Sequence, residues 1–190
     1  MKFYRTGFEH ILEINKKGYG LAEVYAKILL TKILTPYGTG YVDLQSPAGA
    51  GMSVLVYNYD GNVYATDESR MLAEMGDHTF RLGNVRQHSH REIFAGDAFL
   101  NLASASCNQS LTGCSDCAFQ AYCGSDPIYN HATQGDLFGH RPTSDFCKRN
   151  MEIIKYLLRL LSQQDKETMR MFWAWIQNSR IKDINRVAPS

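Results

Sequence analysis

The first forty residues contain two runs of apolar side chains at helical spacing. Gly18 and Gly20 lie between the runs, and Pro36 follows the second one. Glycine and proline interrupt helical patterns, so these positions mark where each helix should end. We therefore expect residues 1–45 to form a helical segment. Its two apolar faces are made by Tyr4, Phe8, Ile11 and Leu12, and then by Leu21, Tyr25, Ile28 and Leu29.

The pattern changes between residues 53 and 66, where β-favouring residues flank Asp60-Gly61. An Asp-Gly pair suits the positive φ angles of a tight hairpin turn, so the sequence predicts a β-hairpin. Asp67 is then expected to cap a helix. One face of that helix carries Met71, Leu72 and Met75, a spacing typical of a packed core.

Helical spacing resumes toward Leu102 and dominates the chain after Cys147. The two apolar faces there need cover, either within this domain or at a contact with another domain. They consist of Ile153, Ile154, Leu157, Leu158 and Leu161, followed by Met169, Phe172, Trp173 and Ile176. The whole pattern predicts an α+β fold with a small β-hairpin plus helices, divided into residues 1–45, 46–165 and 166–190.

Length and composition limit the classes of function. The 190 residues are 44% hydrophobic and 21% charged, which is enough for one core plus flanking helices. The formal net charge of +1 favours neither a nucleic acid nor an anionic membrane as partner. No run reaches the roughly 18 apolar residues of a membrane span, and the N-terminus has no secretory signal, so we expect a cytoplasmic protein.

Four of the five cysteines form the pattern Cys114-x2-Cys117-x5-Cys123-x23-Cys147. The first three are close together in sequence and the fourth is remote. Four thiolates in such a pattern can enclose one metal centre. An odd cysteine count without a secretory signal disfavours a disulfide framework. The small, polar residues around Cys114 and Cys117 are poor core material, whereas Cys107 is expected to be an ordinary packed thiol.

The identity of the metal is open from spacing alone. Structural zinc sites usually have two close pairs of ligands, whereas this chain has three clustered cysteines and one remote one. Iron-sulfur proteins use cysteine ligands of this kind without histidine. However, His131 and His140 lie between Cys123 and Cys147, so a mixed Cys/His zinc site is an alternative.

The run from Gly113 to Gly124, closed by Cys147, resembles the distal cluster-binding half of a SPASM domain. This domain is the C-terminal auxiliary iron-sulfur module of radical S-adenosylmethionine (SAM) enzymes that modify peptides and proteins. The resemblance implies one [4Fe-4S] cluster that relays electrons and shapes the substrate channel. Its implied ligands are Cys114, Cys117, Cys123 and Cys147.

The first auxiliary cluster of that family has no counterpart in the cysteines of this chain. Gly61 matches the family element, but Thr66 occupies the place of one cysteine and residues 45–51 contain none. The residues that follow Cys123 also lack cysteine. The first cluster is therefore expected to be absent, with an oxygen ligand from Asp126 as the remote exception. Residues 67–72, 75–77 and 134–144 further resemble the His-Xaa-Ser system radical SAM maturases.

The C-x3-C-x2-C motif of radical SAM catalysis does not occur in the sequence. The resemblance therefore implies the C-terminal portion of a maturase, inactive alone, whose N-terminal helices complete a partial (β/α) barrel supplied elsewhere. SAM would bind only to that missing catalytic domain. The expected partners are the radical SAM barrel domain and a precursor peptide or protein. A different class of function, a zinc-stapled, non-redox peptide-binding module, is the alternative.

Overall fold

A computed structural model describes residues 1–180 and contains two compact units. The helical unit combines residues 1–39 with the residues from Arg149 onward, and the sheet unit comprises Gly40–Lys148. The expected functional division at residues 45 and 165 stays a prediction. The end of the expected segment 166–190, residues 181–190, lies outside the described residues.

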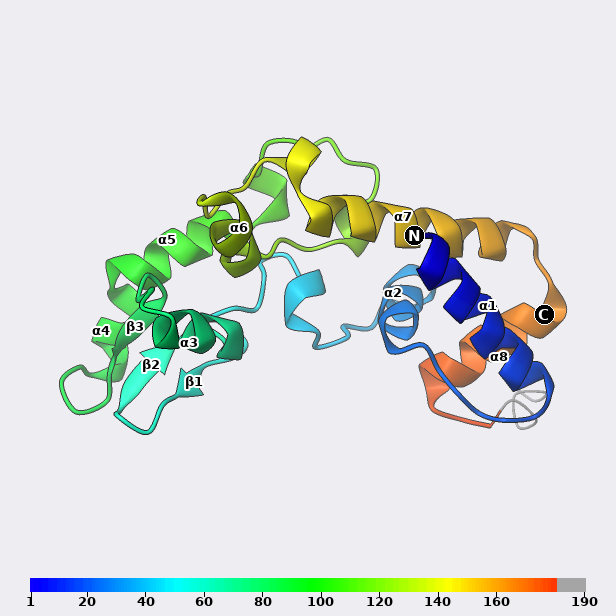
Figure 1. Ribbon diagram of the computed structural model, residues 1–190, viewed down its shortest axis with the longest axis horizontal. Helices are drawn as coiled ribbons and strands as arrows, with labels where there is room; N and C mark the ends of the chain where they lie inside the picture. The colour runs from blue at the N-terminus through cyan, green and yellow to red at the C-terminus, as the bar shows by residue number, and fades with distance from the viewer. Residues whose placement is uncertain (181–190) are drawn as a thin grey trace. The chain divides into compact units, whose positions relative to one another are not determined.

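The helical unit contains α1 (Lys2–Lys16), α2 (Val24–Leu34), α8 (Lys166–Gln177) and most of α7 (Asp145–Ser162) (Figure 1). Both N-terminal helices predicted from apolar spacing are confirmed. Phe8 is fully buried at the centre of the unit, where its ring packs edge to face on Tyr156 at 5.4 Å and on Trp175 at 5.7 Å. Aromatic contacts of this kind contribute beyond the burial of apolar area.

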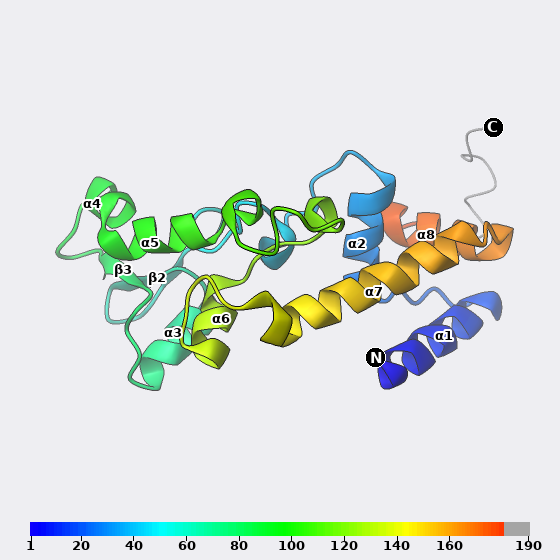
Figure 2. The ribbon, with the colours of Figure 1, turned by 90° about the horizontal axis from the view of Figure 1, so that it is seen from above.

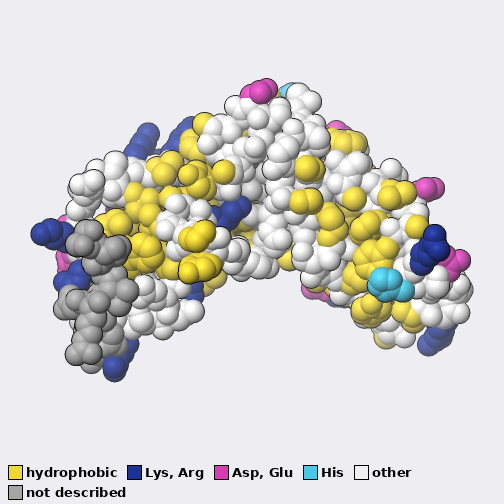
Figure 3. Space-filling model, turned by 180° about the vertical axis from the view of Figure 1, so that it is seen from behind, with side chains coloured by type: hydrophobic (Ala, Val, Ile, Leu, Met, Phe, Trp, Pro, Cys, Tyr) yellow, Lys and Arg dark blue, Asp and Glu magenta, His cyan; other side chains and the backbone are white. Residues whose placement is uncertain are grey.

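The apolar faces of α7 and α8 are largely covered inside the helical unit. Ile153, Ile154, Leu157 and Phe172 are all buried, whereas Trp173 is only half-buried. Met171 and Trp175 contribute to the buried face of α8 instead. Figure 3 shows hydrophobic side chains that also lie at the surface. Within residues 1–180, no helix is both long and apolar enough to cross a membrane.

The sheet unit is built on a three-stranded antiparallel sheet in the order β1-β2-β3. Strands β1 (Val56–Tyr57) and β2 (Asn62–Tyr64) form the predicted hairpin, in which Val56 faces Tyr64. Strand β3 (Arg81–Asn84) was not predicted, because its short sequence has only one apolar residue. With the surrounding helices, this sheet confirms the α+β class.

Helices cover both faces of the small sheet. Figure 2 shows α3 (Asp67–Glu74) on one side, and α4 (His90–Ala95) and α5 (Asp97–Ala105) on the other. The core of the unit is formed by Ala50, Val63, Ala65, Phe80, Leu82, Ile93, Leu102 and Ile128. The remaining elements are α6 (Pro127–Gln134) and the 3-10 turns η1 (Val42–Leu44), η2 (Asn108–Ser110), η3 (Gln120–Tyr122) and η4 (Arg141–Thr143).

The expected details of α3 need correction. Thr66, not Asp67, is the N-cap, because the Thr66 and Ser69 side chains each bond the other residue's backbone N–H in a capping box. This places Ser69 and Ala73 on the buried face. Met71 and Met75 consequently point to solvent, with 55% and 82% of their surface exposed, and the expectation that they belong to the core was wrong.

Candidate metal centre

Consecutive turns hold the first two cysteines of the motif. The Cys114 N–H donates to the Leu111 carbonyl and the Cys117 N–H donates to the Cys114 carbonyl, both at 3.0 Å. The Gln120 side-chain amide spans the loop and donates to the carbonyls of Cys114 and Ser115, both at 3.1 Å. All five cysteines are free thiols. Hydrogen bonds, and no disulfide, therefore define this loop.

The third cysteine follows η3, and its N–H donates to the Phe119 carbonyl at 3.0 Å. The next residue, Gly124, is buried against the backbone of Asp43 and Leu44 in η1. This contact anchors the end of the cysteine loop on the segment that leads into the sheet. Cys123 itself is partly exposed, with Sγ 3.5 Å from the Gly124 carbonyl oxygen.

The fourth cysteine lies in the first turn of α7. The Ser144 hydroxyl accepts a hydrogen bond from the Cys147 N–H at 3.2 Å, as an N-cap side chain does. The positive end of a helix dipole favours negative charge nearby, so this position suits a thiolate. The remote cysteine of the motif is thus positioned by a helix start.

Three of the four thiols influence one another electrostatically. Burial raises the pKa of the Cys114 thiol, and the nearby Cys147 and Cys117 thiols raise it further. Burial also raises the pKa of Cys147, with an additional contribution from Cys117. The Arg141 guanidinium opposes both shifts and favours the thiolate forms. Cys147 is therefore within electrostatic reach of the C-x2-C pair although the two segments are far apart in sequence.

Arg141 is a buried cation beside these thiols, with 8% of its surface exposed. Its aliphatic part packs on Gly113, where an added β-carbon would lie 3.2 Å from Arg141 Cγ. One guanidinium NH2 group donates to the Phe138 carbonyl, while Nε is buried without a hydrogen-bond partner in the described part of the chain. Arg141 was not recognisable from the sequence, because a single arginine in a turn carries no distinctive signal.

The two histidines of the alternative zinc site have other partners. His131 Nε2 lies 2.6 Å from Asp77 Oδ2, and His140 Nδ1 lies 3.0 Å from Thr143 Oγ1. Across residues 1–180, no group of three or more His, Cys, Asp or Glu residues is arranged to hold a metal ion. Cys107 is a partly buried thiol whose Sγ lies 3.1 Å from Gln109 Oε1.

The positions related to the first auxiliary cluster serve as helix caps. Thr66 caps α3, and Asp126 caps α6 by accepting a hydrogen bond from the Tyr129 N–H at 2.9 Å. Burial is the main reason that the pKa of Asp126 rises to about 6, and the carboxyl groups of Asp43 and Glu68 raise it further. The structure thus gives both oxygen-bearing side chains a role in the fold.

The four cysteines Cys114, Cys117, Cys123 and Cys147 have the chemistry that an iron-sulfur cluster requires. Their four side chains are all thiols, and the Phe119 N–H donates to Cys117 Sγ at 3.4 Å. Backbone donors to sulfur and a thiolate-only ligand set are the features by which proteins bind such clusters and tune them. In a [4Fe-4S] cluster each thiolate binds a different iron, so the thiolates do not need to meet at one ion.

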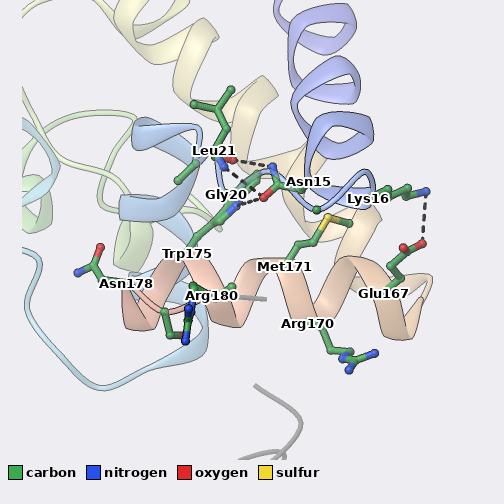
Figure 4. A pocket seen from close by; sticks show the side chains of 14 residues that line it. Asn15, Lys16, Gly20, Leu21, Glu167, Arg170, Met171, Trp175, Asn178 and Arg180 are labelled. Carbon is green, nitrogen blue, oxygen red and sulfur yellow. Dashed lines mark hydrogen bonds and ion pairs between the residues drawn. The ribbon is translucent and has the colours of Figure 1, made fainter. Parts of the chain in front are cut away.

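The helical unit contains a separate cavity of about 750 Å³ between α1, the loop that follows it and α8 (Figure 4). Asn15 lies in its wall and is almost fully buried. The Asn15 amide donates to the Leu21 carbonyl at 2.6 Å, and its oxygen accepts from Trp175 Nε1 at 3.4 Å. At the edge, Lys16 pairs with Glu167 at 3.7 Å. These polar groups hold the loop on the helices, and no cysteine lines the cavity.

Comparison with solved structures identifies similar folds. A hexahistidine-tagged form of anSMEcpe with bound AdoMet aligns with a TM-score of 0.61 and 17% identity, over 93% of this chain and 43% of that chain. Native anSMEcpe with bound AdoMet gives 0.60 and 20%, over 85% and 41%. The native protein with AdoMet and the Kp18Cys peptide gives 0.56 and 20%, also over 85% and 41%.

These neighbours are an anaerobic sulfatase-maturating radical SAM enzyme. At this level of identity the likeness shows a shared fold alone, and it does not support the His-Xaa-Ser subfamily in particular. This chain spans less than half the length of the proteins that it matches. No protein-family model and no curated protein sequence matches the chain.

Proposed function

We propose that the sheet unit is an auxiliary [4Fe-4S] cluster domain of a radical SAM enzyme that modifies a peptide or protein. Its ligands are Cys114, Cys117, Cys123 and Cys147. The observation that carries this proposal is the electrostatic influence of Cys117 and Cys147 on one another beside the buried Arg141, in a chain whose fold resembles part of a radical SAM maturase. The spacing of the cysteines in sequence does not by itself require Cys147 to lie near Cys114 and Cys117.

The residues around the thiols have definite tasks in this proposal. Turn hydrogen bonds orient Cys114 and Cys117, and the start of α7 presents Cys147. The Phe119 N–H stabilises negative charge on the Cys117 sulfur. A cluster with four cysteine ligands supplies one-electron transfer without an open iron for substrate. The protein's part is to hold the thiolates and to limit the access of water.

The catalytic part of the enzyme is proposed to lie outside this sequence. A radical SAM barrel with the C-x3-C-x2-C motif, on a longer chain or in a companion protein, would bind and cleave SAM. The matched structures hold AdoMet, and two of them also hold a peptide, Kp18Cys or Cp18Cys, which supports a peptide or protein as substrate. The His-Xaa-Ser subfamily stays a prediction from sequence alone.

Anaerobic reconstitution of residues 1–190 with iron and sulfide tests the proposal. We expect brown protein with broad visible absorbance and about four irons per chain. Colourless, folded protein that binds one zinc and rejects iron would instead support the zinc-stapled peptide-binding module. Under strong reductant the reconstituted chain alone should not produce 5′-deoxyadenosine from SAM, and production by this chain would contradict the assignment of catalysis to another domain.

A further inference from the structure

Among the described residues, Arg141 has no anionic partner of the kind that a buried charge normally requires. Within residues 1–180 it forms no ion pair with a carboxylate, and its recorded hydrogen bond goes to the Phe138 carbonyl. Its Nε atom is buried and has no acceptor in the same part of the chain. Removing a cation from water costs several kcal/mol unless an anion or a set of hydrogen bonds compensates.

The negative charge that could compensate is that of the cysteine ligands. The Arg141 side chain lies against Gly113, the residue next to Cys114, and is a charged neighbour of both Cys114 and Cys147. Packing on Gly113 fixes the aliphatic part of the side chain. Gly113 has φ +78, a conformation that favours glycine, and a β-carbon at this position would press on Arg141 Cγ. The guanidinium is therefore held beside the ligands by its packing.

We infer that Arg141 is a positioning residue that sets the reduction potential of the cluster, and this inference rests on the proposed function. Four thiolates and a [4Fe-4S] core carry net negative charge, and one-electron reduction adds another negative charge. A fixed cation nearby stabilises the reduced form more than the oxidised form. Because the Arg141 side chain is buried, this interaction is screened less than it would be for a cation at the surface. Arg141 thus raises the midpoint potential.

The chain offers a matched control in Lys148, which also favours the Cys147 thiolate. Its side chain is 56% exposed and lies 3.8 Å from Asp145, so solvent and a neighbouring carboxylate both weaken its field. We would reconstitute the wild-type chain, Arg141→Gln, Arg141→Lys and Lys148→Gln anaerobically. Iron content, circular dichroism and the midpoint potential, measured by spectroelectrochemistry at low and high salt, are the readouts.

We expect Arg141→Gln to shift the midpoint potential to a more negative value, at low and high salt alike. Arg141→Lys keeps the charge and should stay nearer to the wild type. Lys148→Gln should give a smaller shift that disappears at high salt. A wild-type potential in Arg141→Gln with four irons bound would overturn the inference. Wild-type protein that binds no iron would overturn the proposed function instead, so the two failures are distinct.

Arg141→His provides a second test if Arg141→Gln does not fold. Histidine changes its charge at a pKa of about 6.5, so a neighbouring His can be charged or neutral within one sample. The potential of this variant should fall, relative to that of the wild type, as the pH rises through this range. A potential equal to that of the wild type even at about pH 9, well above the ordinary histidine pKa, would show that a charge at position 141 does not influence the cluster and would overturn the inference.

Discussion

Gly124 and Asp43 are in backbone contact: a β-carbon at position 124 would lie 2.0 Å from the Asp43 carbonyl oxygen. It would also come within 2.8 Å of the Leu44 Cα. The residue after Cys123 therefore crosses η1 at a distance that excludes every side chain. This crossing links the end of the cysteine loop to the segment that enters the sheet, so the position of Cys123 depends on the glycine beside it.

Gly124→Ala should therefore destabilise the sheet unit strongly. The obstructing atoms belong to the backbone and cannot rotate away, so we expect a loss of roughly 2–5 kcal/mol in the free energy of unfolding, as for severe overpacking. Chemical denaturation monitored by circular dichroism measures the loss. If the proposed cluster is correct, iron retention should fall too, because Cys123 moves with its neighbour.

Gly7→Ala is the matched control for this substitution. Gly7 lies within α1, and a β-carbon there would meet nothing within 4 Å. Alanine is the better helix former by about 0.5–1 kcal/mol, so this variant should be slightly more stable. Equal stability of Gly124→Ala and the wild type would contradict the close approach of residues 124 and 43.

The sequence predicted local structure well wherever spacing determines it. Phe8 and Leu12 on α1, and Asp60-Gly61 in the hairpin, act through neighbours in sequence, so periodicity and turn chemistry are sufficient. The capping of α3 was misplaced by one residue because Thr66 and Asp67 are both good caps. Only the capping box with Ser69 distinguishes them.

The features that sequence reasoning missed depend on contacts between distant segments. Gly124 was recognisable as part of a motif, but the sequence does not show why glycine is needed there. The structure shows that the backbone of Asp43 leaves no room for a β-carbon at this position. Arg141 gains its importance from Cys114 and Cys147, which lie on different segments. No periodicity encodes such contacts. The ligand set itself was predicted from the spacing of the cysteines, and the role of all four cysteines in metal binding stays a prediction.

Substitution of single cysteines tests that ligand set. Cys114→Ser, Cys117→Ser, Cys123→Ser and Cys147→Ser should each lose most of the iron after reconstitution, because every thiolate holds one iron. Each should also lower the stability of the reconstituted protein, since metal-binding energy contributes to folding. Iron per chain and thermal unfolding of the holo form are the measurements.

Cys107→Ser is the control in this series. The Cys107 thiol bonds Gln109 within its own turn, and a hydroxyl can donate to the same oxygen. Iron content should remain near that of the wild type. Loss of iron in Cys107→Ser together with retention in Cys147→Ser would mean that the ligand assignment is wrong.

Asn15→Leu should destabilise the helical unit although the two side chains have similar size. The buried amide of Asn15 satisfies the Leu21 carbonyl and Trp175 Nε1, and leucine would leave both without this partner. Each unsatisfied buried group costs about 1–3 kcal/mol, so we expect a loss of roughly 2–4 kcal/mol in chemical denaturation. His10→Leu, on an exposed position of α1, should change stability by less than about 0.5 kcal/mol.

The half-buried carboxyl of Asp126 should make the stability depend on pH. Burial raises its folded-state pKa from the ordinary 3.8 to about 6, so the folded protein keeps a proton that the unfolded chain releases. The contribution to stability is full below about pH 4 and is lost as the pH rises through about 6. At about 1.4 kcal/mol per unit, the total loss is at most roughly 2–3 kcal/mol.

Asp126→Asn isolates this effect because asparagine is an equally good helix cap for α6. The variant should match the wild type near pH 4 and exceed its stability at pH 7, as measured by urea denaturation across that range. Asp165→Asn, at the cap of α8, should behave in the opposite way. The Thr168 backbone N–H lowers the pKa of Asp165, so this carboxylate stabilises the fold at neutral pH. If the stability of Asp126→Asn depended on pH in the same way as that of the wild type, another carboxyl group would be responsible for the effect.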